Sequence, residues 1–169
     1  MSWPMRSMVI LLLAACAACG FHLRGELPLP VEMQQTYLDY RGSDTDVRRV
    51  LARILGKNGV TVVRSRGEAT AILRILRATV EQEVISKNID GRPTEYRITA
   101  KWSIRLSLAD GSRSGEILTA EQDTVLSLDP TDPLGARVAR DEAASDLRKR
   151  VARQVLERLA ATGLPAAAD

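Results

Sequence analysis

The sequence is poor in the side chains that catalytic and metal sites most often use. Its 169 residues include one histidine, His22, and two cysteines, both close to the N-terminus. Catalytic triads, Cys–His pairs and zinc clusters each need several such groups to converge. His22 lies only a few residues from these cysteines, where a pocket cannot easily form. We therefore expect no metal, no cofactor and no enzymatic activity.

Aromatic residues and a charge excess of one sign are also scarce. Aromatics make up 4% of the chain, and the formal net charge is +3. Lysines and arginines alternate with acids along the sequence and do not form one concentrated patch. Nucleic-acid binding proteins usually carry such a patch, often with aromatic residues on which bases stack. The composition therefore predicts no nucleic-acid partner, while 45% hydrophobic and 27% charged residues suit one globular domain.

The N-terminus has the pattern of a secretory signal. Arg6 is the one charge before a short apolar run at 8–15, which is too short for a permanent membrane-spanning helix. The run ends in Leu13-Ala14-Ala15-Cys16, followed by Ala17-Ala18-Cys19. Small residues before a cysteine resemble the lipobox of bacterial lipoproteins, in which the cysteine is acylated and becomes the first mature residue. An ordinary secreted protein with two spare cysteines is the alternative.

Two cysteines compete for the lipid. Cys16 has the better local box, with Leu13 three places before it, whereas Cys19 follows a signal of more usual length. Acyl chains would hold the domain at the periplasmic side of a membrane without spanning it. With Cys19 as the anchor, residues 1–18 are a signal peptide and residues 19–30, which are rich in glycine and proline, an acylated tether.

Hydrophobic spacing predicts the order β-α-β-β-β-β-α. A strand is expected over 31–40, followed by a helix whose apolar residues recur at 47, 50, 51, 54 and 55. Further strands are expected over 60–64, 69–86, 96–108 and 116–128, with Asp-Gly turns at 90–91 and 110–111. In the strand over 69–86, Ile72, Leu76, Ala78, Val80 and Val84 are expected to point inward.

A second helix is expected to begin at Pro133 and to stop at Gly163. Its apolar line is predicted to be Leu134, Val138, Leu147, Val151, Val155 and Leu159. The fold class is α+β, with both helices packed on one face of a mixed, largely antiparallel four- to five-stranded sheet. One domain is predicted over residues 31–164, and residues 165–169 form a short flexible tail.

The polar face of the strand over 96–108 carries a line of cations, Arg97, Lys101 and Arg105. They could bind a multiply phosphorylated ligand, or they could be neutralised by acids on neighbouring strands. We favour neutralisation, which predicts Lys101 near Asp123 and Arg97 near Glu83 and Glu81.

Cations at the strand ends and loops have fewer such neighbours: Lys87 and Arg92 flank one turn, and Arg137 and Arg140 begin the second helix. Acids near the helix starts, among them Asp44, Asp129 and Asp132, are expected to cap helices.

The stretch Cys19-Gly20-Phe21-His22-Leu23-Arg24-Gly25 resembles the mature N-terminus of the LPS-assembly lipoprotein family, LptE. The likeness favours Cys19 over Cys16 and extends more weakly over the mature chain. It implies an outer-membrane lipoprotein that forms a plug-and-barrel complex with the β-barrel LptD. Such a protein assists LptD assembly, binds lipopolysaccharide and helps deliver it to the outer leaflet.

The resemblance also implies where lipopolysaccharide would bind. The basic contacts of the family would fall near Lys87, Arg92 and Arg140, with Arg137 close by. Two other functions remain open: a periplasmic lipoprotein accessory to another lipid-transport system, and a lipoprotein hydrolase, against which the single histidine argues.

Overall fold

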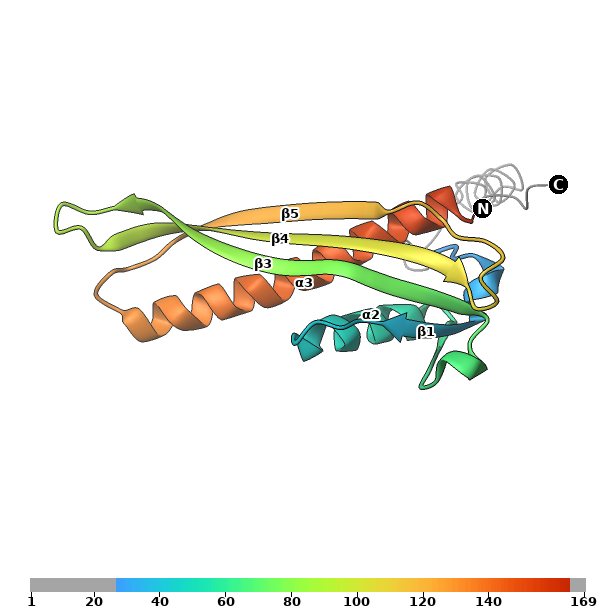
Figure 1. The fold of residues 1–169 in the computed structure, drawn as a ribbon. Helices are drawn as coiled ribbons and strands as arrows, with labels where there is room; N and C mark the ends of the chain where they lie inside the picture. Colours follow the sequence, from blue (N-terminus) through green and yellow to red (C-terminus); the bar gives the residue numbers. More distant parts are fainter. Residues whose placement is uncertain (1–26, 165–169) are drawn as a thin grey trace, which may run out of the picture.

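The computed structural model describes residues 27–164, in which two helices cover one face of a five-stranded sheet (Figure 1). This arrangement confirms the predicted α+β class and the mixed, largely antiparallel sheet. The long elements are β3 (Ala71–Lys87), β4 (Pro93–Leu108), β5 (Leu118–Ser127), α2 (Thr45–Lys57) and α3 (Pro133–Thr162). The shorter ones are β1 (Gln35–Asp39), β2 (Thr61–Val63) and the 3-10 turns η1 (Val31–Gln34) and η2 (Arg66–Glu68).

The strands lie in the order β2-β1-β3-β4-β5. β1 pairs in parallel with β2 and β3, whereas β3, β4 and β5 form an antiparallel meander. The pairing of β1 with β3 ends at Asp39 and Arg74, so most of β3 and β4 extends beyond β1 (Figure 1). The first half of α3 accompanies this extension, while α2 lies under the shorter strands.

The core lies between the sheet and the helices. β4 supplies its central row, in which every second residue is buried: Ile98, Ala100, Trp102, Ile104 and Leu106. α2 adds Val47, Leu51 and Leu55, and α3 adds a longer row from Ala144 to Leu159. Burying each large aliphatic side chain contributes about 1.5–3 kcal/mol, so the buried rows of β4, α2 and α3 together account for much of the stability.

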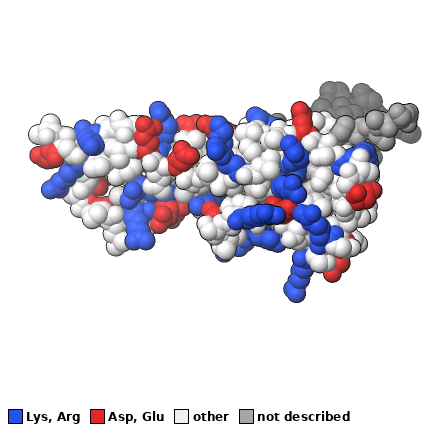
Figure 2. Space-filling view, viewed as in Figure 1, with Lys and Arg blue, Asp and Glu red and all other residues white. Residues whose placement is uncertain are grey.

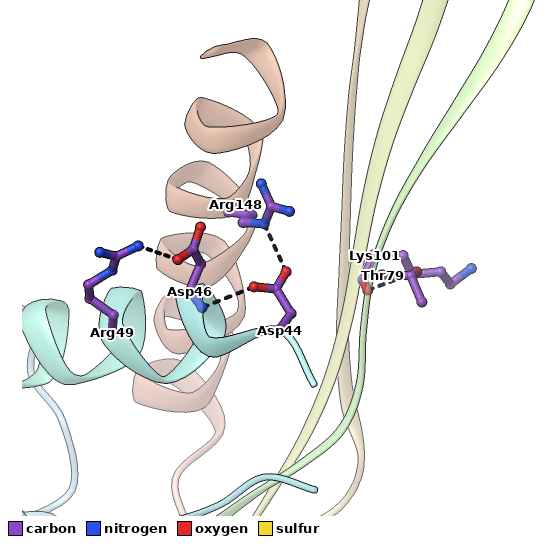
Figure 3. A network of polar contacts seen from close by, with 6 residues as sticks. All are labelled: Asp44, Asp46, Arg49, Thr79, Lys101 and Arg148. Carbon is purple, nitrogen blue, oxygen red and sulfur yellow. Dashed lines mark hydrogen bonds and ion pairs between the residues drawn. The ribbon is translucent and has the colours of Figure 1, made fainter. Parts of the chain in front are cut away.

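Short-range polar contacts fix both helix starts. Asp44 caps α2 by accepting a hydrogen bond from the backbone N–H of Asp46, and Asp132 caps α3 through Gly135 N–H. Asp44 also accepts a hydrogen bond from Arg148 Nε at 3.1 Å, which joins the start of α2 to the middle of α3 (Figure 3). The carboxylate of Asp46 in turn pairs with Arg49. Capping by Asp44 and Asp132 is as predicted.

Three expectations about the strands are wrong. The first strand begins at Gln35, because residues 31–34 form a 3-10 turn that the buried Thr36 hydroxyl closes by donating to Met33 C=O. In β3 the register shifts between Ile75 and Arg77, so Leu73 and Ile75 point inward and Leu76 is exposed. Lys101 pairs with Glu121, at 2.9 Å, and not with Asp123, which lies opposite Thr99.

The apolar line predicted for α3 holds only from Leu147 onward. Leu134 and Val138 are 72% and 50% exposed, because the first turns of the helix accompany the projecting strands beyond the core. The predicted start at Pro133 and the stop at Gly163 are confirmed. Gly163 has a φ of +64°, a backbone conformation that residues other than glycine rarely adopt.

Candidate functional site

A shallow depression of about 220 Å³ lies where the projecting part of β4 meets the first turns of α3. Its cations are Arg92, just before β4, and Arg140 on α3. The lining also includes Tyr96 of β4 and Asp129 of the β5–α3 connection. Pro93, Leu128, Pro130, Pro133 and Ala136 complete the lining. The structure therefore brings two of the predicted lipopolysaccharide-binding residues, 48 positions apart in sequence, to one surface feature.

Arg140 is held by two contacts. Its guanidinium carbon lies 4.7 Å from the centroid of the Tyr96 ring, which is a cation–π distance. Its Nε donates a hydrogen bond to Ala136 C=O at 3.2 Å, one turn earlier in α3. A guanidinium has five N–H donors, and within residues 27–164 this is the one hydrogen bond that it makes. The other donors can bind a planar or tetrahedral anion such as a phosphate.

Asp129 places a negative charge in the same depression. Its carboxylate accepts hydrogen bonds from the Thr131 hydroxyl at 2.6 Å and from the Thr131 N–H at 2.8 Å. These bonds, the hydroxyl first, lower the pKa of Asp129 below its usual value, so it is ionised at neutral pH. Asp129 closes this turn. The expectation that it caps α3 is wrong, because Asp132 is the N-cap of that helix. The depression thus combines two cations with one fixed anion.

Lys87 and Arg137 lie outside the lining of the depression. Lys87 ends β3 opposite Pro93, across the hairpin that the Asp90-Gly91 turn closes. Arg137 is largely exposed and lies 3.9 Å from the carboxylate of Asp141, one turn further along α3. Both are near neighbours in sequence of depression residues, but neither is held by the contacts that hold Arg140.

The line of cations on the outer face of β4 is largely paired. Lys101 pairs with Glu121 on β5, and Arg97 approaches Glu83 on β3 at 3.8 Å. Lysines and arginines are also interspersed with acids over most of the face in Figure 2. This agrees with neutralisation across strands and not with a phosphate-binding row. Among residues 27–164, no three His, Cys, Asp or Glu side chains are grouped to hold a metal ion.

Cys16, Cys19, His22 and the tail at 165–169 lie outside the described residues, as does most of the predicted tether. Among the helices that the structure describes, none combines the length and the apolar character needed to cross a membrane.

Sequence reasoning missed two residues of the depression, Tyr96 and Asp129. Tyr96 follows the inward alternation of β4 and so reads as a core residue. Asp129, just before Pro130, reads as a capping residue. Neither carries a local signal for ligand binding, because their roles depend on how α3 crosses the end of the sheet.

The family model for LptE, described as "Lipopolysaccharide-assembly", matches residues 32–159. The match covers the sheet, α2 and nearly all of α3. This chain belongs to the LptE family. Members are lipopolysaccharide-assembly lipoproteins associated with membranes, and not enzymes, so the predicted non-enzymatic function is confirmed.

Two relatives named "LPS-assembly lipoprotein LptE" share the family. The protein from Photorhabdus laumondii is 22% identical over 143 residues, covering 85% of this chain and 78% of that protein. The one from Pectobacterium atrosepticum is 24% identical over 147 residues, covering 85% and 77%.

Solved structures share the LptE-like fold. Lipoprotein B from Nitrosomonas europaea superposes with a TM-score of 0.67 at 22% identity, over 84% of this chain and 91% of that one. A minor lipoprotein from Acinetobacter baumannii gives 0.66 at 18% identity, over 84% and 100%.

Proposed function

We propose that this chain is an outer-membrane lipoprotein, acylated at Cys19, that forms a plug-and-barrel complex with LptD. In this role it assists assembly of the barrel, binds lipopolysaccharide and aids its delivery to the outer leaflet. Membership of the LptE family is the observation that carries the proposal. The mixed surface charge supports it further, because the lumen of a large barrel is polar and suits a polar plug.

The depression formed by Arg92, Tyr96 and Arg140 is the proposed contact for lipopolysaccharide. Lipid A carries phosphates, which arginine recognises through paired N–H donors. Arg140 is fixed in place by Tyr96 and Ala136, so little of its side-chain freedom remains to be lost on binding. Lys87 and Arg137 flank the depression and would add long-range attraction without a fixed geometry.

Purification from outer membranes tests the complex. The native acylated chain is extracted in mild detergent and the chains that come with it are identified by mass spectrometry. We expect a large β-barrel protein in a stable ratio, and acyl chains on Cys19 in the mass of the N-terminal peptide. An unlipidated or solitary chain would contradict the proposal, and a different partner would favour the accessory role in another lipid-transport system.

Charge reversal tests the contact. The variant Arg92→Glu/Arg140→Glu should lose at least about tenfold in affinity for lipopolysaccharide, because two favourable phosphate contacts become repulsive. The matched control Arg64→Glu/Arg77→Glu changes the net charge equally at exposed arginines outside the depression and should bind nearly as the parent does. If Arg92→Glu/Arg140→Glu, and also the triple reversal with Lys87→Glu, left binding unchanged, these positions would not be the contact.

A further inference from the structure

A second basic feature lies between α2 and α3, away from the depression described above. It is a groove of about 250 Å³ with the half-buried Val50 and Ile54 at its base and four cations around it: Arg53, Lys57, Lys149 and Arg153. Its lining includes no carboxylate. The groove therefore concentrates positive charge over a small apolar floor.

Most of this charge is not neutralised. Lys149 pairs with Asp146 at 2.8 Å. For Arg53, Lys57 and Arg153, no ion pair is formed with any carboxylate in the part of the chain that the structure describes. Two other arginines of the same helices are paired, Arg49 with Asp46 and Arg148 with Asp44. Three exposed cations in one groove thus remain free to bind an anion.

The start of the described chain is fixed beside this groove. The side-chain oxygen of Asn58, a residue of the groove lining, accepts a hydrogen bond from Leu27 N–H at 2.5 Å. The Asn58 amide nitrogen donates to Ile54 C=O at 2.7 Å, which locks the side chain against α2. Leu27 and Leu29 then pack against the core. The described part of the chain therefore begins at the rim of the groove.

Chain length limits how far the groove can be from the predicted anchor. Leu27 lies eight positions after Cys19, and at about 3.3–3.6 Å per position this stretch spans at most about 26–29 Å. A domain anchored at Cys19 can thus bring the groove to the headgroups of its own membrane. Long basic side chains over an apolar floor suit that boundary, because their charged ends reach phosphates while their methylene stems stay on apolar surface.

We propose that, before the domain enters a barrel, the groove between α2 and α3 binds the phosphate headgroups of anionic lipids in the bilayer that carries the acyl anchor. Stable attachment through lipid chains commonly combines acylation with a basic patch. Here the patch would also set orientation, turning the helices toward the bilayer and the outer face of the sheet away from it. The proposal rests on the acylation of Cys19 included in the proposed function.

A spin label beside the groove can test this orientation. Gly56 on α2 is exposed, and a Cβ added there meets no atom within 4 Å, so Gly56→Cys should be tolerated. In the acylated mature chain it would be the one free thiol, since cleavage removes Cys16 and acylation blocks Cys19. A nitroxide is attached at this position, and its collision rate with a neutral nickel chelate is measured. The rate is compared between vesicles of phosphatidylcholine alone and vesicles that also contain one fifth phosphatidylglycerol.

We expect the collision rate to fall at least about threefold when phosphatidylglycerol is present, and to recover in high salt, which screens the attraction. A label at Glu81→Cys, on the exposed outer face of β3, should be equally accessible in both vesicles. Arg53→Glu/Lys57→Glu should abolish the protection of the Gly56 label, and the milder Arg53→Gln/Lys57→Gln should weaken it. The control Arg64→Glu/Arg77→Glu should retain it.

Three results would overturn the proposal. The Gly56 label could be equally accessible in both kinds of vesicle, or the control variant could lose the protection as completely as Arg53→Glu/Lys57→Glu does. Inorganic phosphate could also protect the label equally well when the chain is in neutral detergent. The last would indicate a site for free anions. The mass of the N-terminal peptide and the co-purified barrel are measured separately, so failure of the proposed function can be told apart from failure of the groove proposal. An acylated, barrel-associated chain without lipid-dependent protection would refute the groove alone.

Discussion

Tyr96 and Arg140 show how one aromatic ring can orient a cation in a chain that has few aromatic residues. The guanidinium lies against the ring, while Ala136 C=O accepts a hydrogen bond from its Nε. A cation–π contact of this kind contributes about 0.5–2 kcal/mol, depending on how far it is shielded from water. Arg140 is thus oriented before any ligand arrives, unlike the more exposed Arg137 three residues earlier.

Asp129 should weaken the binding of anions at the same depression, because its hydrogen bonds to Thr131 lower its pKa and keep it charged. We expect Asp129→Asn to raise the affinity for lipopolysaccharide by about threefold to tenfold at low salt, since one repulsive charge is removed. An asparagine oxygen can still accept both Thr131 bonds. The gain should shrink in high salt.

Binding titrations at two salt concentrations measure this effect. Asp123→Asn, at an exposed position on β5 that does not line the depression, is the control and should change the affinity little. An unchanged or lower affinity for Asp129→Asn alone would mean that the carboxylate does not face the bound anion.

At the scale of elements, β3 and β4 differ in how well their sequences predict which side chains are buried and which are exposed. β4 alternates without interruption, so its buried residues follow directly from a period of two. β3 carries a register shift next to Leu76, and one inserted residue exchanges the two faces beyond it. Apolar residues stand on both sides of the shift, so no pattern in the strand alone reveals where it lies.

α3 should divide into a stabilising half and a half that contributes little to stability. Leu134→Ser and Val138→Ser should each change the free energy of unfolding by less than about 0.5 kcal/mol, because these side chains are already exposed. Leu147→Ala should cost about 2–5 kcal/mol, since Leu147 is fully buried. Urea unfolding followed by circular dichroism measures both, and a large loss for the exposed pair would show that the first turns of α3 are packed.

At the scale of the whole molecule, acid should destabilise the fold. Asp110, Asp129 and Asp146 have pKa values lowered mainly by hydrogen bonds, from Ser112, Thr131 and Lys149 respectively. The pKa of Glu32 is lowered chiefly by a backbone hydrogen bond, with Arg113 assisting against the effect of burial. Carboxyls with lowered pKa values stabilise the folded state once the pH exceeds their unfolded values.

This stabilisation should be lost as the pH falls below about 4 and through the lowered values. Thermal unfolding between pH 7 and pH 3 should show a Tm that is nearly constant at first and then falls. Asp110→Asn, Asp129→Asn and Asp146→Asn combined should reduce the fall, and a Tm that rises on acidification would contradict the assignment.

The candidate depression could be predicted only in part. Arg92 and Arg140 stand out in sequence as cations at a turn and at a helix start, where neutralising neighbours are few. Whether they meet depends on the angle at which α3 crosses the end of the sheet, which side-chain packing between distant residues such as Trp102 and Leu147 decides. Helical spacing alone places Arg137 and Arg140 on neighbouring faces and cannot tell which one meets Tyr96.

The position of α3 in the chain has a consequence for biogenesis. It supplies seven buried residues, the last of them Leu159, and it follows every strand of the sheet in the chain. Under the proposed function, a polypeptide exported N-terminus first cannot fully cover the apolar side of its sheet until α3 has also crossed the inner membrane. Until then Trp102 and its neighbours are open to aggregation, so the newly exported chain should be a client of periplasmic chaperones.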